Sequence, residues 1–110
     1  MGDTSGTRPL FSSFADDPAL GAAIHEFVLG LAERIDALQD AYSRRDFKDL
    51  AQIAGGLASH ALRVGFEPVA SCASQIETTS VAQELEPSYD ALVELTELVC
   101  RTRLGHRGAA

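Results

Sequence analysis

Apolar residues recur at steps of three and four over most of this chain, and that spacing constrains the fold more than any other feature of the sequence. Side chains at these steps share one face of an α-helix. The clearest run begins after Asp17 and Pro18, which form a helix-start signal of an acidic cap followed by proline. It predicts one helix of about seven turns that ends near Tyr42. Its apolar stripe consists of Leu20, Ile24, Phe27, Leu31, Ile35, Leu38 and Tyr42.

Three further amphipathic segments follow. The second helix is expected over residues 47–64, with Gly65 as a natural stop. The third begins at Glu67 and loosens over residues 78–80, and the fourth begins near Glu86. Four such helices with short connections predict an all-α fold, an antiparallel up-down four-helix bundle with a short N-terminal helical segment.

The length of 110 residues suits one domain. Hydrophobic residues make up 45% of the chain, which is enough for a core of modest size. We expect residues 1–8 to form a disordered lead-in, because this stretch is polar and rich in glycine. We expect residues 9–104 to form the bundle and residues 105–110 to form a flexible tail.

The formal net charge of −7 restricts the class of partner. Binding to nucleic acid or to an anionic membrane surface needs clustered lysine and arginine, so neither is expected. The basic residues are scattered, apart from a small group formed by Arg44, Arg45 and Lys48. No apolar run approaches the length of a membrane span.

The chain has two cysteines, Cys72 and Cys100, and both lie in apolar helical patterns. They are too few for a disulfide scaffold and lack the spacing of metal ligands. We therefore expect two buried free thiols, as is typical of a protein in the reducing cytoplasm.

Motifs that carry enzyme chemistry are missing from the sequence. It contains no glycine-rich phosphate loop, no histidine pair at helical spacing and no serine elbow. No grouping of nucleophile, base and orienting residue appears, so we expect neither catalysis, nor a cofactor, nor a bound metal. His25 on the first helix and His106 near the end are expected to have no functional role.

The second helix and its flanks follow a fixed pattern. Asp46 to Ala51 lead into the spaced residues Ala54, Leu57 and Ala61, and these are followed by Val64-Gly65-Phe66 and Ile76-Glu77. This frame, which covers roughly residues 10–103, resembles that of histidine phosphotransfer (HPt) domains. Members of that family are four-helix bundles that pass phosphoryl groups between receiver domains, or from a histidine kinase to a receiver. The resemblance implies a place in a bacterial two-component phosphorelay.

Three positions depart from the family pattern of Ala-His-x-Leu-Lys-Gly-x-Ala. Gly55 stands where the phosphorylated histidine belongs, Ala58 where the lysine belongs, and Ser59 where a small glycine lets a receiver approach. A glycine has no nucleophile, so no phosphoramidate forms there. An alanine cannot hold an incoming phosphoryl group by its charge. The resemblance therefore implies a degenerate site at Gly55, Ala58 and Ser59.

His60 is an alternative phosphate acceptor, because residues 60–63 read His-Ala-Leu-Arg and by themselves resemble the family core. This alternative moves the histidine motif five residues along the chain, so that the residues on either side of it no longer match the family pattern. Position 60 also lies about 140° around the helix from Gly55. We therefore expect His60 at the edge of the core, partly buried and hydrogen bonded, and Gly55 opposite the core, in solvent.

The helix face around Gly55 carries no charge, although 23% of the residues are charged. An uncharged, smooth face suits protein docking, while drift at a disused site would leave the same composition. The predicted docking face consists of Ala51, Gln52, Gly55, Ala58, Ser59 and Leu62.

These observations favour a pseudo-HPt protein, which docks a response-regulator receiver domain or a histidine kinase without carrying phosphate, and which we expect to be a monomer. Two alternatives remain open. One is a true phosphocarrier that uses His60, and the other is a generic helical interaction module.

Overall fold

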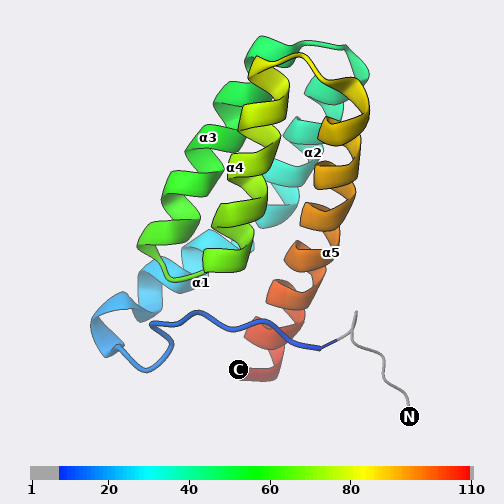
Figure 1. Ribbon diagram of the computed structural model, residues 1–110. Helices are drawn as coiled ribbons and strands as arrows, with labels where there is room; N and C mark the ends of the chain where they lie inside the picture. The colour runs from blue at the N-terminus through cyan, green and yellow to red at the C-terminus, as the bar shows by residue number, and fades with distance from the viewer. Residues whose placement is uncertain (1–7, 110) are drawn as a thin grey trace.

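The computed structural model describes residues 8–109, and it confirms the all-α class for this part of the chain (Figure 1). Five α-helices and one short 3₁₀ helix are present here, and these residues form no strand. The predicted lead-in lies outside the described residues except for Arg8. The elements are η2 (Pro18–Leu20), α1 (Gly21–Leu29), α2 (Leu31–Ser43), α3 (Phe47–Arg63), α4 (Glu67–Val81) and α5 (Leu85–Ala109).

The helices α2, α3, α4 and α5 pack side by side, and each reverses the direction of the one before it (Figure 1). The most extensive contact is between α3 and α4, followed by that between α4 and α5. The apolar stripes meet in one core, as their spacing predicted. Each of these helices contributes a side chain with no exposed surface: Leu38, Leu57, Ile76 and Leu95.

The first long helix is broken, and the prediction of one continuous helix from Pro18 to Tyr42 is wrong. α1 ends at Leu29 and α2 begins at Leu31, with Gly30 at the junction. Below this junction α1 leaves the axis of α2 at one end of the bundle (Figure 1). Glycine weakens a helix interior, and the apolar stripe stays buried on both sides of the break. The periodicity therefore predicted the burial of the apolar stripe correctly but gave no sign of the change of direction at Gly30.

Residues 8–17, which precede η2, are not helical. Residues 8–12 have no regular secondary structure and residues 13–16 form turns, so η2 is the only helical part of residues 8–20. Asp17 caps η2 as predicted, since its carboxylate accepts a hydrogen bond from the N–H of Ala19 at 2.9 Å.

This N-terminal segment ties the turn between α3 and α4 to the end of α5. The N–H of Ser13 donates to the carbonyl of Gly65 at 2.8 Å, and the N–H of Leu10 donates to the carbonyl of Arg101 at 2.9 Å. Gly65 follows α3 as predicted and has a φ of +85°, which favours glycine. The segment thus closes one end of the bundle.

The last two helices run longer than predicted. α4 continues through residues 78–80 without loosening, since the Thr78 hydroxyl donates to the carbonyl of Ser74 one turn earlier. α5 runs to Ala109, so residues 105–109, for which we expected a flexible tail, continue the helix. Among residues 8–109, no helix combines the length and the apolar character needed to span a membrane.

Candidate functional site

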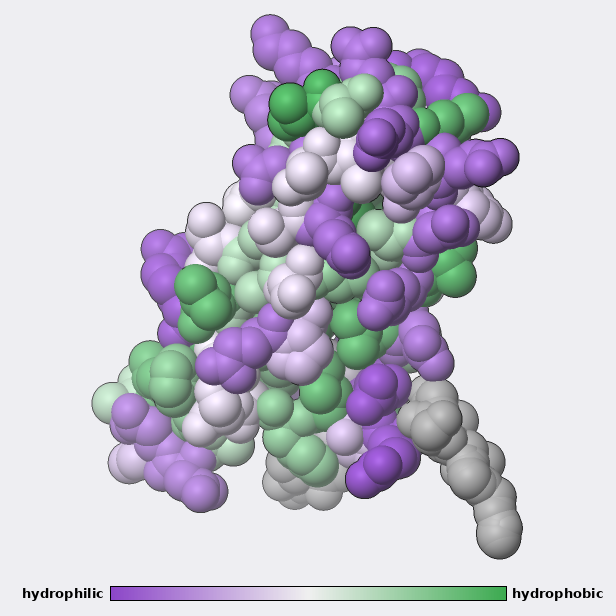
Figure 2. Space-filling view, in the orientation of Figure 1, coloured by the Kyte–Doolittle hydropathy of each residue, from purple (hydrophilic) through white to green (hydrophobic). Residues whose placement is uncertain are grey.

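A shallow groove runs between α3 and α4 and contains most of the predicted docking face. In Figure 2 the surface over these two helices is mostly pale, with hydrophilic side chains around it. The small side chains along the groove leave it smooth and open. It is lined by Gly55, Ala58, Ser59 and Leu62 from α3 and by Glu67, Ala70, Ser71, Ser74 and Glu77 from α4.

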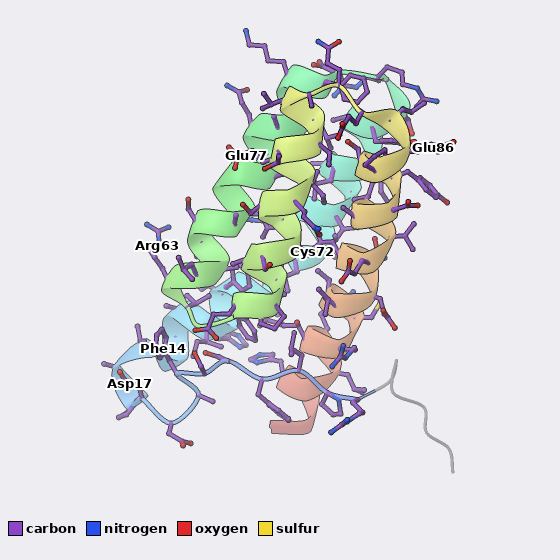
Figure 3. All side chains as sticks on the ribbon, in the orientation of Figure 1. Phe14, Asp17, Arg63, Cys72, Glu77 and Glu86 are labelled. Atoms are coloured by element: carbon purple, nitrogen blue, oxygen red, sulfur yellow. The ribbon has the colours of Figure 1, made fainter. Side chains whose placement is uncertain are left out.

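Gly55 lies in this groove beside α4, so the prediction that it stands in open solvent is wrong. It is half-buried and faces α4. A Cβ atom added to Gly55 would lie 2.8 Å from Oε2 of Glu77 and 3.3 Å from Oε1. Figure 3 shows Glu77 on α4, on the side next to α3. A wheel built on one stripe misses this contact because α3 has neighbours on two sides, α2 and α4.

The two adjacent glycines of α3 therefore have different surroundings. Gly56 is exposed, and an added Cβ there would meet nothing within 4 Å. Of these two glycines, only Gly55 lets a neighbouring group approach closely through its lack of a side chain. The carboxylate of Glu77 occupies the space above Gly55.

Of the other five residues of the predicted docking face, three line the groove and two do not. Ala58 is half-buried, while Ser59 is exposed, and Leu62 keeps 58% of its surface exposed at one end of the groove. Ala51 is half-buried and Gln52 is exposed, but neither lines the groove.

The predicted docking face left out two charged residues that line the groove. Glu67 and Glu77 line the groove from α4, so the surface is acidic at these points and not free of charge. The sequence contains both residues, but nothing in one helix indicates which residues of the next helix share its groove.

His60 is half-buried and hydrogen bonded, as its place at the edge of the stripe suggested. Nη2 of Arg34 lies 2.9 Å from Nδ1, and the ring packs edge-on against Phe27 with the ring centres 4.8 Å apart. A guanidinium group only donates, so Nδ1 must hold the lone pair and Nε2 the proton. Burial, followed by the nearby charges of Arg34 and Arg63, lowers the pKa of His60 below its ordinary 6.5.

The other two histidines meet, which no sequence pattern indicated. Nδ1 of His25 on α1 lies 2.8 Å from Nε2 of His106 on α5, although the residues are 81 positions apart in the chain. Metal-ligand spacing in a sequence reveals only histidine pairs within one helix or loop. His25 and His106 lie on different helices, far apart in the sequence.

The cysteines differ from each other. Cys72 is buried and its thiol donates to the carbonyl of Ala91, with 3.2 Å between sulfur and oxygen. Burial, with a smaller contribution from Glu94, raises the pKa of Cys72 to about 12. Cys100 is exposed, so the prediction that both thiols are buried is wrong for this residue. It follows the buried Val99 on α5 and points outward.

In the small basic group near the turn between α2 and α3, Arg44 is paired with nearby carboxylates. Arg44 contacts three carboxylates at distances of 3.0 to 3.2 Å, and each of the four side chains keeps at least 40% of its surface exposed: Asp40, Asp46, Asp49 and Arg44 itself. Such exposed pairs add little stability. They nevertheless neutralise the charge of Arg44 locally.

Comparisons of the chain with family models, with curated proteins and with solved structures found no match.

Proposed function

We propose that this protein is a pseudo-HPt protein of a bacterial two-component phosphorelay, and that it docks a partner without carrying phosphate. The partner is a response-regulator receiver domain or a histidine kinase, bound over the groove between α3 and α4. The observation that carries the proposal is the environment of Gly55. By the sequence resemblance, this residue stands where HPt domains carry their phosphorylated histidine, and the carboxylate of Glu77 lies in the space above it.

The chemistry of this groove supports docking without transfer. Gly55 supplies no nucleophile, so no phosphorus–nitrogen bond forms at this position. Ala58 supplies no positive charge for a phosphoryl group. The carboxylates of Glu77 and Glu67 in the same groove repel one. All three features disfavour phosphoryl transfer at this groove.

The shape of the groove supports a protein partner. Small side chains on both helices allow close approach, and the exposed Leu62 offers an apolar anchor at one end. A partner that fits here carries a matching apolar residue and basic groups toward Glu67 and Glu77, because opposite charges steer and orient association.

The alternative of a phosphocarrier that uses His60 has less support. Its Nδ1 is paired with Arg34, and its ring is packed against Phe27. A phosphoryl group on Nδ1 would replace this hydrogen bond.

The proposal is tested by measuring binding to each purified receiver domain and kinase encoded in the same genome. The test variant is Leu62→Glu, and the matched control is Val93→Glu, which changes a similarly exposed apolar residue on α5. We expect at least one partner to bind the wild type and the Val93→Glu variant. We expect Leu62→Glu to weaken that binding about tenfold or more, as at a binding hot spot.

Two results would contradict the proposal. The first is that no receiver domain and no kinase binds. The second is that both variants bind as tightly as the wild type. Light scattering after size exclusion provides a further check, since a stable homodimer closed over the groove would favour the generic interaction module.

A further inference from the structure

A pair of histidines joins α1 to the far end of α5. Nδ1 of His25 and Nε2 of His106 lie 2.8 Å apart, with the ring centres at 4.9 Å and the ring planes inclined by 45°. His25 is exposed and His106 is half-buried, so solvent reaches the pair. The chain has three histidines in all, and two of them meet here.

We propose that His25 and His106 form a two-histidine chelate for a divalent transition-metal ion such as Zn²⁺, Ni²⁺ or Cu²⁺. Imidazole nitrogen is a preferred ligand of these ions, and the site has no carboxylate ligand set suited to Ca²⁺ or Mg²⁺. This inference is independent of the proposed docking function, because the pair lies on different helices from the groove.

The distance between the nitrogens is close to what chelation needs. Zinc–nitrogen bonds of about 2.0–2.1 Å at a tetrahedral angle place the two nitrogens roughly 3.3 Å apart. The two nitrogens must therefore move apart by about 0.5 Å, and both rings must turn so that their lone pairs converge on the ion. Both side chains lie at the surface, so side-chain rotation is sufficient and the helices need not move.

The protons balance without a net change of charge on the rings. In the neutral pair one ring donates its N–H to the lone pair of the other. When the ion binds, the donor ring takes the other tautomer, and its proton moves through solvent to its second nitrogen. Both facing nitrogens then present lone pairs to the ion, as ligation requires.

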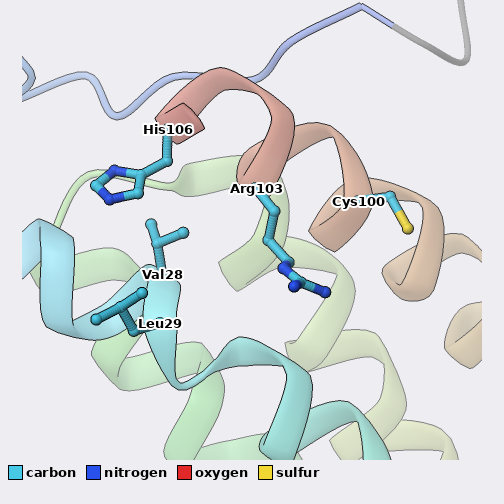
Figure 4. A pocket seen from close by; sticks show the side chains of 5 residues that line it. All are labelled: Val28, Leu29, Cys100, Arg103 and His106. Carbon is cyan, nitrogen blue, oxygen red and sulfur yellow. The ribbon is translucent and has the colours of Figure 1, made fainter. Parts of the chain in front are cut away.

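The surroundings limit the coordination to these two protein ligands. Figure 4 shows the pocket beside the pair, in which the His106 ring reaches toward α1 while the sulfur of Cys100 points away. The Arg103 side chain in the same pocket extends away from the ring. Within the described part of the chain, no group of three or more His, Cys, Asp or Glu could hold a metal. Water fills the remaining positions, which makes this an open site.

A bound ion would add a bridge between segments far apart in the chain. α1 and α5 already pack together, and the chelate fixes the end of α5 on α1. Because the ion binds the folded chain, it raises the melting temperature as its concentration rises.

The test is calorimetric titration of the full chain with ZnCl₂, and separately with NiCl₂, in a non-chelating buffer at about pH 7.5. The variants are His25→Gln and His106→Gln. The matched controls are His60→Gln, which removes a histidine elsewhere, and Cys100→Ser, which removes the nearest thiol. Circular dichroism checks that each variant is folded, and His25 is exposed, so its replacement leaves the core intact.

We expect one ion per chain in the wild type and in both controls. We expect His25→Gln and His106→Gln each to weaken binding about tenfold or more and to abolish the rise in melting temperature. The proposal is overturned if neither metal binds, if both histidine variants bind like the wild type, or if Cys100→Ser removes the binding.

Discussion

The carboxylate of Glu77 on α4 lies against the bare backbone of Gly55 on α3, so that a Cβ atom at position 55 would be 2.8 Å from Oε2. This contact links the sequence departure at position 55 to the packing of two helices. A side chain at position 55 would have to displace the end of Glu77. The glycine is therefore part of the surface that includes Glu77, and a histidine placed at position 55 would have to displace that carboxylate.

The two neighbouring glycines of α3 are expected to respond differently to alanine. Gly56→Ala should raise the free energy of unfolding by about 0.5–1 kcal/mol, because alanine favours the helix and an added Cβ at position 56 meets nothing. Gly55→Ala should give a smaller gain, since Glu77 must move aside. Adding Glu77→Ala should recover the difference. Urea denaturation measures the stability of all three variants. Equal gains in stability from Gly55→Ala and Gly56→Ala would contradict the contact between Glu77 and Gly55.

Gly65 is expected to be the least replaceable glycine at the closed end of the bundle. Its φ of +85° costs alanine about 1–2 kcal/mol. An added Cβ would also come within 2.9 Å of the hydroxyls of Ser12 and Ser13. Gly65→Ala should therefore lower the free energy of unfolding by at least this amount and expose the N-terminal segment to proteases. A variant as stable as the wild type would show that the segment does not pack on this turn.

The stability of the fold should depend on pH through His60. Its pKa in the folded protein is below 6.5, chiefly because of burial and then because of Arg34 and Arg63. The unfolded chain thus binds this proton more readily, so the contribution is complete above about pH 6.5 and is lost as the pH falls through the folded pKa. His60→Gln should flatten this part of the stability curve. An NMR titration midpoint of His60 at or above 6.5 would contradict this explanation.

The two thiols should differ in reactivity. Cys100 is exposed and should react readily with a thiol reagent in the folded protein, whereas Cys72 is buried and has a pKa of about 12. Mass spectrometry after brief labelling should find one modified cysteine, and Cys100→Ser should remove it. Fast labelling of Cys72 in the native state would indicate that α4 and α5 open in that region.

Much of the fold follows from local rules in the sequence. The second predicted helix spans Phe47–Arg63, and Asp46 caps it with a carboxylate that accepts from the N–H of Asp49 at 3.0 Å. Pro68 marked the start of α4, and Gly65 marked the end of α3. These signals act within a few residues, so a sequence reading finds them.

The features that sequence reading missed depend on contacts between distant segments. The break at Gly30 is a change of direction that leaves the apolar stripe intact. The contact of Glu77 with Gly55 depends on how α4 lies along α3. The meeting of His25 with His106 depends on α1 crossing the end of α5. None of these relations has a period or spacing in the sequence.

The most direct test of the proposed function is a phosphoryl-transfer assay with a partner that binds. The receiver domain is phosphorylated with a radiolabelled small-molecule phosphodonor and mixed with this protein, and the two chains are then separated. We expect a complex in which all of the label stays on the receiver, for the wild type and for His60→Gln alike. Acid-labile label on this protein that disappears in His60→Gln would contradict the proposal and would identify His60 as a phosphate carrier.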